Sequence, residues 1–538
     1  MHDSIEFLRH IRRAENQKKY EQAETNLKVA VLGTNSIQYI VKGIRYLMYE
    51  QYGINSIVYE GEYDGIAKAI LDENSDYYTF NPEVTVLLPD SKTADIDVYQ
   101  SFWQRMPGYI LQSNFVVPNI TALGNLEANV EFSETYRLES ANLELIRRKP
   151  SNVTILNFNG LASRLGTDRW FDYPTWFNTK YGFSLDFLPD VCSLITRQIG
   201  ALVGKTRKCL VLDLDNTLWG GVVGDDGCDG IMLDPNNPVG EAYRFFQQYL
   251  LDLKNRGVIL AVCSKNDLEI AVEPFNKNPN MILKRSDIAC FIANWQDKAT
   301  NLRMIAGALN IGTDSLVFFD DNPAEREIIR LNLPEVAVID VPQDPAYYAK
   351  ALSDSGVFDW LQITKEDRIR AASYQTNQER EKLLHQAVDY DAYLEALEMQ
   401  YEIGFLDAKR IPRFAQLINK SNQFNLRTQR YSESQIEQML ADPTYTLIYA
   451  ELTDKFDYYG LISCVILKNN FIDTWVMSCR VLKRKVEDKV FDFILQHTQG
   501  TLTGEYLPTA KNKMVENFYP SFGFHETERK GEYVYERV

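Results

Sequence analysis

The sequence predicts an α/β protein with two layered parallel-sheet domains, followed by an α+β domain. Three observations favour this class. Over about the first 350 residues, short apolar runs that end in polar turns alternate with segments of helical spacing. Such alternation is typical of parallel sheets covered by helices. The chain has 538 residues, too many for a single hydrophobic core, so several domains are expected. Its composition, with 45% hydrophobic and 24% charged residues, is typical of globular proteins.

Residues 1–200 are expected to form the first α/β domain. KVAVLGTNS (28–36), EVTVLLPD (83–90) and NVTILNFNG (152–160) are predicted strands followed by polar turns. Between the first two, YIVKGIRYLMYEQYG (39–53) has helical spacing. Sites in such domains are expected at the carboxyl ends of the strands.

Residues 205–350 repeat the pattern in a second α/β domain. KCLVLDLDNT (208–217), GVILAVCSKND (257–267) and DSLVFFDDNPAER (314–326) are predicted strands that run into polar or acidic turns. Because parallel strands end at one edge of a sheet, we expect these polar side chains to lie close together.

Residues 351–400 are expected to form a helical linker, because the stretch from about 360 onward is charged and lacks Pro and Gly. Residues 401–538 are predicted to form an antiparallel α+β domain. Its predicted strands and helix are TLIYAEL (446–452), GLISCVILKN (460–469), FIDTWVMSC (471–479) and EDKVFDFILQHT (487–498).

The net charge of −17 argues against general nucleic-acid binding and against adhesion to anionic membranes. The amino-terminal stretch lacks the apolar core of a secretory signal, and no run approaches the roughly 20 apolar residues of a membrane span. The seven cysteines form no CxxC pair, which favours reduced thiols. We expect a cytoplasmic protein without membrane insertion.

The DLDNT turn points to phosphoryl chemistry. Asp213, Asp215 and Thr217 follow the predicted strand at alternate positions. Two carboxylates this close stay ionised only beside a cation, and oxygen ligands favour Mg²⁺. Asp213 can then attack phosphorus, while Asp215 gives a proton to the leaving oxygen and later takes one from water.

Further residues complete this set. Ser264 and the backbone of Thr217 can donate to phosphoryl oxygens, and Lys298 can pair with the nucleophile and the phosphate. Asp320 and Asp321 can close the metal shell. An acidic turn after a strand is common by itself. The ordered set of Asp-x-Asp-x-Thr, serine, lysine and paired aspartates is far more specific for phosphoryl chemistry.

These residues carry a resemblance to a known family. LVLDLDNTLWGGVVGDDG (210–227) closely resembles the FkbH family within the haloacid dehalogenase (HAD) superfamily. The short gap between Gly227 and the next predicted helix leaves no room for a large cap domain. The resemblance implies that Asp213 is the nucleophile and Asp215 the general acid and base. It also implies phosphate contacts from Thr217, Ser264 and Lys298. Mg²⁺ would be bound by Asp213, the Asp215 carbonyl and either Asp321 or Asp320, of which Asp321 is favoured.

The last domain also looks like FkbH proteins, which there carry a domain similar to GNAT acyltransferases. SNQFNLRTQRY (421–431), IDTWVMSCRVL (472–482) and YLPTAKNKMVENFYPSFGF (506–524) carry this likeness, which spans roughly residues 150–538. The resemblance implies dephosphorylation of a small acyl phosphate such as 1,3-bisphosphoglycerate. The glyceryl group would pass to the phosphopantetheine thiol of an acyl carrier protein.

A basic stretch departs from the family pattern. Relatives often read SCRVLGRG where this chain reads SCRVLKRK, so lysines 483 and 485 stand at two glycine positions. Their side chains are expected to hinder a coenzyme A pyrophosphate on the backbone. The cations expected to contact a phosphopantetheine arm or an acidic carrier are Arg480, Lys483, Arg484 and Lys485.

Two alternatives stay open for Cys479. It is either a small buried residue at a strand end or an acyl-accepting thiol activated by nearby cations. His497 is the one histidine near it in sequence, and Cys464, inside an apolar strand, is expected to be a core residue.

The first domain is similar to SGNH-type hydrolases through LGTNS and NFNG. The likeness implies Ser36 as nucleophile and Asn159 as oxyanion donor. The Gly-Asp-Ser form and a following Asp-x-x-His are absent from the sequence, so Ser36 lacks a base. We therefore expect a non-catalytic domain with a structural or substrate-docking role.

Three functions are compatible with the sequence. The first is a Mg²⁺-dependent enzyme that couples dephosphorylation to acyl transfer. The second is a stand-alone HAD phosphatase whose last domain is a docking module, in a surface polysaccharide or secondary-metabolite pathway. The third, a non-catalytic scaffold, is disfavoured because the residues for aspartyl-phosphate chemistry are present.

Overall fold

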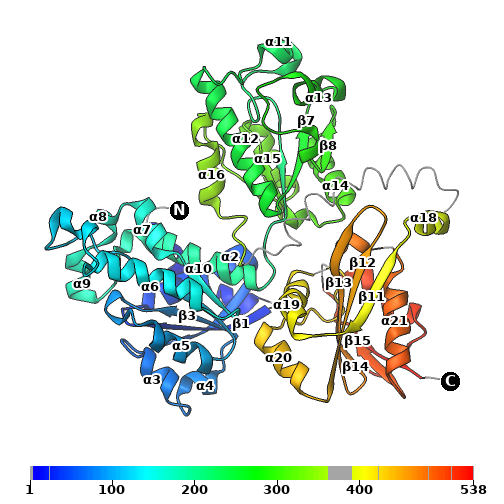
Figure 1. Ribbon diagram of the computed structural model, residues 1–538, viewed down its shortest axis with the longest axis horizontal. Helices are drawn as coiled ribbons and strands as arrows, with labels where there is room; N and C mark the ends of the chain where they lie inside the picture. The colour runs from blue at the N-terminus through cyan, green and yellow to red at the C-terminus, as the bar shows by residue number, and fades with distance from the viewer. Residues whose placement is uncertain are drawn as a thin grey trace. The chain divides into compact units, whose positions relative to one another are not determined.

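The described part of the chain forms three sheets, whose strands Figure 1 colours blue, green, and yellow to red along the sequence. The computed structural model describes residues 4–23, 25–361, 390–421, 423–482, 484–509 and 512–536, with only the backbone of Tyr390, Asp391 and Cys479. Its contacts divide the chain into two units. They are Met1–Lys205 with Tyr431–Gln438, and Thr206–Arg430 with Met439–Val538. None of the helices in these described ranges has the length and apolar character needed to cross a membrane.

The N-terminal sheet is parallel throughout, with the strand order β2-β1-β3-β4-β5. The chain runs from β1 to β2 on one side and then returns to β3 on the other, so the β1–β3 crevice is a topological switch point. The strands are β1 (Thr25–Gly33), β2 (Ile54–Glu60), β3 (Val84–Leu88), β4 (Tyr109–Ser113) and β5 (Val153–Leu156).

Helices flank this sheet, which explains its continuous apolar strands (Figure 1). Ala30 and Leu32, on one face of β1, share a core with Tyr99 and Leu138. Helices α2 and α10 approach closely, because a Cβ at Gly43 would lie 2.4 Å from the Cys192 sulfur. The helices are α1 (Ser4–Asn16), α2 (Gln38–Tyr52), α3 (Ile66–Leu71), α4 (Asp76–Phe80), α5 (Ile96–Arg105), α6 (Glu134–Arg148), α7 (Phe158–Leu165), α8 (Thr167–Trp170), α9 (Tyr173–Thr179) and α10 (Leu188–Leu202).

The second sheet is also parallel, with the order β10-β9-β6-β7-β8. Alternate residues of each strand face opposite helical layers. Leu210 and Leu212 pack in one core with Phe246, whereas Cys209 and Val211 pack in the other. The strands are β6 (Cys209–Leu212), β7 (Ile259–Ser264), β8 (Cys290–Ala293), β9 (Leu316–Phe319) and β10 (Ala337–Val338).

The helices of this part extend beyond its predicted end at residue 350. Tyr348 and Leu352 of the last helix pack in the same core as Phe319, so that helix belongs to the second sheet. Residues 362–389 of the predicted linker lie outside the described residues. The helices are α11 (Val223–Gly230), α12 (Pro238–Arg256), α13 (Leu268–Lys277), α14 (Lys298–Ala308), α15 (Pro323–Asn332) and α16 (Tyr348–Ser355).

The third sheet has the strand order β11-β12-β13-β14-β15-β17-β16. Its pairs are antiparallel except for β14 and β15, which pair in parallel after the crossover through α21. The predicted all-antiparallel arrangement is wrong at this one pair, because a crossover helix returns the chain in the same direction. The strands are β11 (Gln400–Phe405), β12 (Tyr445–Thr453), β13 (Tyr458–Lys468), β14 (Phe471–Met477), β15 (Leu502–Glu505), β16 (His525–Glu526) and β17 (Glu532–Tyr535).

An aromatic core covers one face of this sheet. Trp475 packs edge-on against Phe518, and their ring centroids are 4.8 Å apart. Cys464, on β13, is fully buried, which confirms its predicted place in the core, and burial raises the pKa of its thiol. The helices are α18 (Tyr390–Ala396), α19 (Ile411–Lys420), α20 (Glu433–Ala441), α21 (Val486–His497) and α22 (Phe518–Ser521).

Candidate active site

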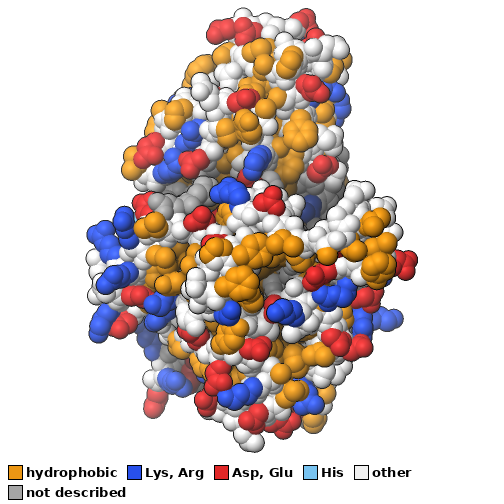
Figure 2. Space-filling view, turned by 90° about the vertical axis from the view of Figure 1, so that its left-hand side faces the viewer, with side chains coloured by type: hydrophobic (Ala, Val, Ile, Leu, Met, Phe, Trp, Pro, Cys, Tyr) orange, Lys and Arg blue, Asp and Glu red, His pale blue; other side chains and the backbone are white. Residues whose placement is uncertain are grey.

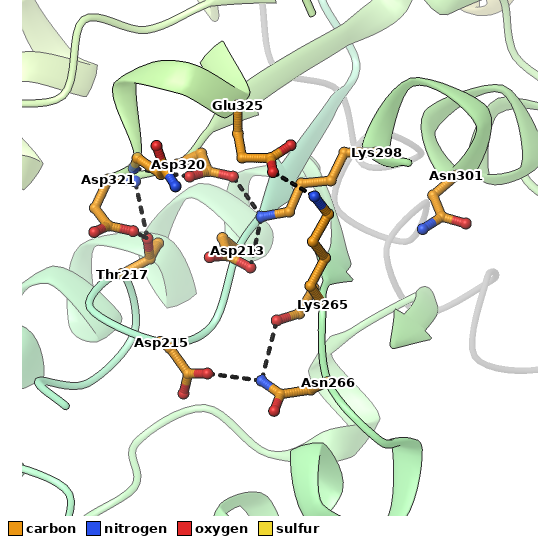
Figure 3. A network of polar contacts seen from close by, with 12 residues as sticks. Asp213, Asp215, Thr217, Lys265, Asn266, Lys298, Asn301, Asp320, Asp321 and Glu325 are labelled. Atoms are coloured by element: carbon orange, nitrogen blue, oxygen red, sulfur yellow. Dashed lines mark hydrogen bonds and ion pairs between the residues drawn. The ribbon is translucent and has the colours of Figure 1, made fainter. Parts of the chain in front are cut away.

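Strand ends of the second sheet bring the predicted site residues together. Asp213 directly follows β6, Ser264 ends β7 and Asp320 follows β9. Strand β6 lies between β7 and β9 in a parallel sheet, so their carboxyl ends meet at one edge. Lys298, the first residue of α14, extends its side chain toward Asp213 and Asp320 (Figure 3).

Lys298 is buried between two carboxylates. Its Nζ lies 3.0 Å from Oδ1 of Asp213 and 2.6 Å from Oδ2 of Asp320. Burial opposes the ammonium charge, but the two carboxylates outweigh it and raise the pKa of Lys298. A permanent cation therefore lies beside the carboxylate that was predicted to be the nucleophile.

The acidic groups of this site are crowded and poorly solvated. One oxygen from each of Asp213, Asp320 and Asp321 lies within 4.8 Å of the others. Burial raises the pKa of Asp213 to about 6, although the Lys298 charge opposes the rise. Burial also raises the pKa of Asp320, against Lys298, and the pKa of Asp321, where the charge of Asp213 adds to the effect. Three oxygen donors around excess negative charge suit a hard divalent cation such as Mg²⁺.

The two neighbouring aspartates differ in how much of each carboxylate is already engaged. Asp320 uses Oδ2 for Lys298 and accepts the N–H of Asn322 on Oδ1 at 2.9 Å. Asp321 has one side-chain contact, a long 3.5 Å approach of the Thr217 hydroxyl to Oδ1. Asp321 therefore keeps the less engaged carboxylate of the two, and its predicted role as the direct metal ligand stays a prediction.

Asp215 is held by N–H donors. Its Oδ1 accepts from Trp219 Nε1 and from the Val223 backbone N–H, both at 2.9 Å, and its Oδ2 accepts from Asn266 Nδ2 at 2.7 Å. Asn216, next in the turn, adopts a left-handed conformation with φ 54°. This turn points Asp215 away from Asp213 and toward Asn266 (Figure 3).

Ser264 and Thr217 are both buried at this edge. Ser264 is close enough for its hydroxyl to lower the pKa of Asp213 by hydrogen bonding. The N–H of Thr217 donates to the Leu214 carbonyl at 3.0 Å within the turn, and the predicted phosphate contact of Thr217 stays a prediction. The Thr217 hydroxyl instead accepts the Asp321 N–H at 3.3 Å and orients that turn.

Sequence reasoning missed four neighbours of the site. Asn266 holds Asp215, and the Nζ of Lys265 lies 2.6 Å from Glu325 (Figure 3). Arg326 donates to the carbonyls of Asp320 and Asp321, at 2.8 and 2.7 Å. The SKND and NPAER turns contained these residues, and their positions after β7 and β9 were the available signal.

Within the described residues 206–361, no large cap is inserted between the first strand of this sheet and helix α12. Helix α11 ends at Gly230 and α12 begins at Pro238, so the inserted segment is short. This confirms the absence of a large cap that was expected from the gap after Gly227.

The basic stretch differs from its prediction. Arg484 is 7% exposed, and its guanidinium pairs with Asp454 at 3.1 Å and with the Tyr459 hydroxyl at 2.8 Å. It therefore does not form the exposed carrier contact that was predicted, because its charge is neutralised inside the domain. Arg480 donates to the Tyr459 carbonyl at 2.8 Å, while Lys485 is exposed. Lys483 and the Cys479 side chain lie outside the described residues.

The start of α21 retains the backbone of a glycine loop. Lys485, its N-cap, has φ 55°, the left-handed conformation that glycine adopts without strain. Glu487 and Asp488 occupy the first turn, and burial raises the pKa of both carboxyls. The two carboxyls lie at the positive end of the helix dipole, where they oppose the binding of a further anion. His497 ends the same helix, with its ring against Phe493 at 4.1 Å.

In the N-terminal domain, Ser36 is not paired with a base. Its hydroxyl donates to the Thr179 carbonyl at 2.5 Å. Asn159 accepts the Val117 N–H at 3.1 Å, whereas Asn114 lines the adjacent cavity. Asn159 is not one of the described residues that line this cavity, and its predicted role as oxyanion donor stays a prediction.

Comparisons with known proteins agree with this arrangement. A family model for the FkbH N-terminal domain matches residues 28–94 and 87–199. The crystal structure of the N-terminal part of the protein BF1531 from Bacteroides fragilis, described as containing a phosphatase domain complexed with Mg, is 37% identical. The match covers 66% of this chain and 99% of that chain, with a TM-score of 0.62.

Two further comparisons do not bear on the fold. An S. aureus MnaA–UDP structure is 10% identical with a TM-score of 0.16, over 67% of this chain and 96% of that chain, too low to inform the fold. The search of curated proteins found no match.

The fold and the site define a HAD-type parallel α/β domain without a large cap, preceded by a second parallel α/β domain. Given a relative of 37% identity matched over nearly its whole length, the chain belongs to the FkbH-like family.

Proposed function

We propose that this chain is a Mg²⁺-dependent HAD-type phosphatase that acts on a small phosphorylated acyl substrate through an aspartyl-phosphate on Asp213. The observation that carries this proposal is the buried Asp213–Lys298–Asp320 group, with Lys298 3.0 Å from Asp213. The phosphatase domain and the Mg described for the similar Bacteroides fragilis protein support it.

The first half-reaction transfers a phosphoryl group to the protein. An oxygen of Asp213 attacks phosphorus, the bond from phosphorus to the substrate oxygen breaks, and Asp215 protonates the leaving oxygen. Water then attacks the phosphoaspartate, gives its proton to Asp215 and releases inorganic phosphate. Lys298 stabilises the charge that develops beside Asp213.

Mg²⁺, held by Asp213, Asp321 and the Asp215 carbonyl with Asp320 behind them, would neutralise the phosphoryl oxygens. Asp215 serves as acid and base only after one of its three N–H donors is exchanged for substrate or water. Asn266, which donates to both Asp215 and Ser264, is placed to guide that exchange.

We further propose that the chain transfers the three-carbon acyl group of a 1,3-bisphosphoglycerate-like substrate to a phosphopantetheinyl carrier protein. The Cys479 thiolate would attack the acyl carbon and displace the phosphate of the acyl phosphate, whereas Asp213 would remove the separate phosphate that is held as an ester. The carrier thiolate would then attack this thioester and release Cys479. The likeness of residues 472–482 to the family and the exposed Lys485 support this step.

A stand-alone phosphatase with a docking C-terminal domain is the second candidate. Two observations favour it: the burial of Arg484 against Asp454, and the acidic first turn of α21. Both reduce the positive charge available for a phosphopantetheine phosphate.

One incubation separates these candidates. The protein, Mg²⁺, 1,3-bisphosphoglycerate and a panel of carrier proteins are combined, and carrier mass and released phosphate are measured together. Acyl transfer predicts a glyceryl adduct, which Cys479→Ala abolishes while phosphate release from a phosphomonoester continues. Asp213→Asn should stop that phosphate release. Release without an adduct on any carrier favours the stand-alone phosphatase, and release that survives Asp213→Asn contradicts the proposed site.

A further inference from the structure

Two buried tyrosines contact the backbone of the turn formed by residues 213–217. The hydroxyl of Tyr348, the first residue of α16, donates to the Asn216 carbonyl at 3.0 Å. The hydroxyl of Tyr243, on α12, donates to the same oxygen over a longer 3.4 Å. Figure 2 views the side of the protein on which α16 lies in Figure 1 and shows charged and hydrophobic side chains mixed on that face. The two tyrosines are 2% and 4% exposed, so both rings lie beneath the surface.

The residue that they contact has an unusual backbone conformation. Asn216 has φ 54°, in the left-handed region that costs most side chains roughly 1–2 kcal/mol and that asparagine tolerates best after glycine. Its side chain is fixed as well, because its Oδ1 accepts the Gly221 N–H at 2.9 Å. Contacts to both the side chain and the carbonyl therefore hold Asn216 in this conformation.

Helix α12 also holds the chain just after the turn. Gln247 is fully buried, and its Nε2 donates to the Leu218 carbonyl at 2.8 Å. Gln247 and Tyr243 are four residues apart, so they lie on one face of α12. This helix therefore directs two polar side chains to backbone carbonyls of one short segment.

The conformation of Asn216 determines where Asp215 points. The torsion φ of Asn216 is the rotation between the rest of that residue and the peptide group that carries Asp215. If the Asn216 carbonyl is released, this torsion relaxes and the Asp215 carboxylate moves away from the N–H donors that hold it. A misplacement of about 1 Å in a reacting group costs about 10²-fold in rate.

We propose that Tyr348 and Tyr243 are positioning residues, which hold the Asn216 carbonyl and so keep Asp215 directed at the leaving oxygen of the substrate. The inference rests on the proposed phosphatase, because it concerns the residue assigned there as acid and base. Burial raises the pKa of Tyr243 to about 12 and also raises the pKa of Tyr348, and the charge of Asp321 adds to both shifts. Both hydroxyls therefore stay protonated and continue to donate.

Leaving-group dependence tests the inference on the full-length protein with Mg²⁺. Benzyl phosphate has a poor leaving group that needs a proton, whereas 4-nitrophenyl phosphate has a good one that leaves without it. Tyr348→Phe keeps the ring and removes the hydroxyl. It should lower kcat/KM about tenfold for benzyl phosphate and less than about threefold for 4-nitrophenyl phosphate.

The second tyrosine gives a test of shared action. Tyr243→Phe, which removes the longer contact, should have a smaller effect in the same direction. The double variant should lose more than the product of the two single losses, because each hydroxyl still holds the carbonyl when the other is absent.

Two matched variants separate positioning from a general loss of stability. Tyr347→Phe, at the neighbouring exposed position, should leave both rates unchanged. Leu352→Ala, in the same helix and core as Tyr348, should lower the melting temperature but keep the wild-type ratio of the two rates below its transition.

Asp215→Asn in the same assay reports on the proposed function. It should lose far more kcat/KM with benzyl phosphate than with 4-nitrophenyl phosphate, and equal losses would contradict the acid role and the positioning inference together. If Asp215→Asn shows this difference while Tyr348→Phe keeps the wild-type ratio of the two rates, the positioning inference is overturned and the phosphatase stands. Independent, multiplicative effects of the two tyrosine variants would also overturn it.

Discussion

Asp213→Asn should stabilise the metal-free protein. Burial raises the pKa of Asp213 from 3.8 to about 6, which means that the fold penalises its ionised form. A shift of about two units corresponds to roughly 3 kcal/mol, the upper limit of the gain when the charge is removed. Lys298 keeps its 2.6 Å contact with Asp320 in the variant, so the lysine stays paired.

The effect depends on pH in a defined direction. A carboxyl group whose pKa is raised in the folded state contributes stability below its unfolded pKa, and this is lost as pH rises through about 6. The asparagine side chain that replaces this carboxyl group does not titrate. In EDTA, the advantage of Asp213→Asn should therefore be large at pH 8 and small at pH 4.5.

Scanning calorimetry measures the effect. The relevant transition is the one that Mg²⁺ shifts upward in the wild type, because a ligand of the folded state stabilises it. In EDTA at pH 8 the variant should melt several degrees higher, at about 2–4 °C per kcal/mol for a domain of this size. Its Mg²⁺ shift should be greatly reduced.

Asp215→Asn is the matched control, two residues away. Its carboxylate accepts three N–H bonds, and an amide must turn a donor toward one of these donors. This variant should lose about 1–3 kcal/mol at both pH values. A lower melting temperature for Asp213→Asn in EDTA at pH 8, or an equal gain at both pH values, would refute the reasoning.

The remaining predictions concern three cations. Lys298→Met should lower the turnover of a phosphomonoester about 10²–10³-fold, because the positive charge beside Asp213 is lost. Phosphate release measures this turnover, and a near-normal rate would show that Lys298 has no part in the mechanism. Arg484→Met should cost about 3–5 kcal/mol in urea unfolding, because the buried Asp454 carboxylate loses the cation beside it. Arg529→Met removes an exposed ion pair and should cost under about 1 kcal/mol, and equal losses for the two variants would contradict this difference. Lys485→Gly should raise the free energy of unfolding in the same assay by about 1 kcal/mol, because glycine adopts the left-handed φ of 55° without strain. A lower free energy of unfolding would show that the lysine side chain contributes to folding.

Much of the parallel α/β architecture follows from local pattern. The apolar runs before Asn35, Asp213, Ser264 and Asp320 are long enough for a buried strand and end in turns, and the structure places a parallel strand at each. Since parallel strands share an edge, Asp213, Ser264 and Asp320 were expected to meet, and they do. Lys298 begins a helix and not a strand end, and its compact positive charge was the reason to expect it beside the nucleophile.

The partners of charged groups were less accessible to sequence reasoning. Arg484 stands in a run of cations that predicts an exposed basic face, yet Asp454, 30 residues earlier, draws it inside. The pairing of β14 with β15 was missed because strand direction after a helix depends on how the chain returns to the sheet.

The sequence by itself determined the strand-and-turn order and the chemistry of the turn at Asp213, because residue type and spacing act over a few neighbours. Tertiary structure alone decided that Asp321, and not Asp320, keeps a less engaged carboxylate, and that Asp215 faces Asn266. It also decided that loops as distant as Asn35 and Trp176 enclose one cavity. These outcomes depend on contacts between segments far apart in the chain, where burial and charge select among partners that local pattern leaves equivalent.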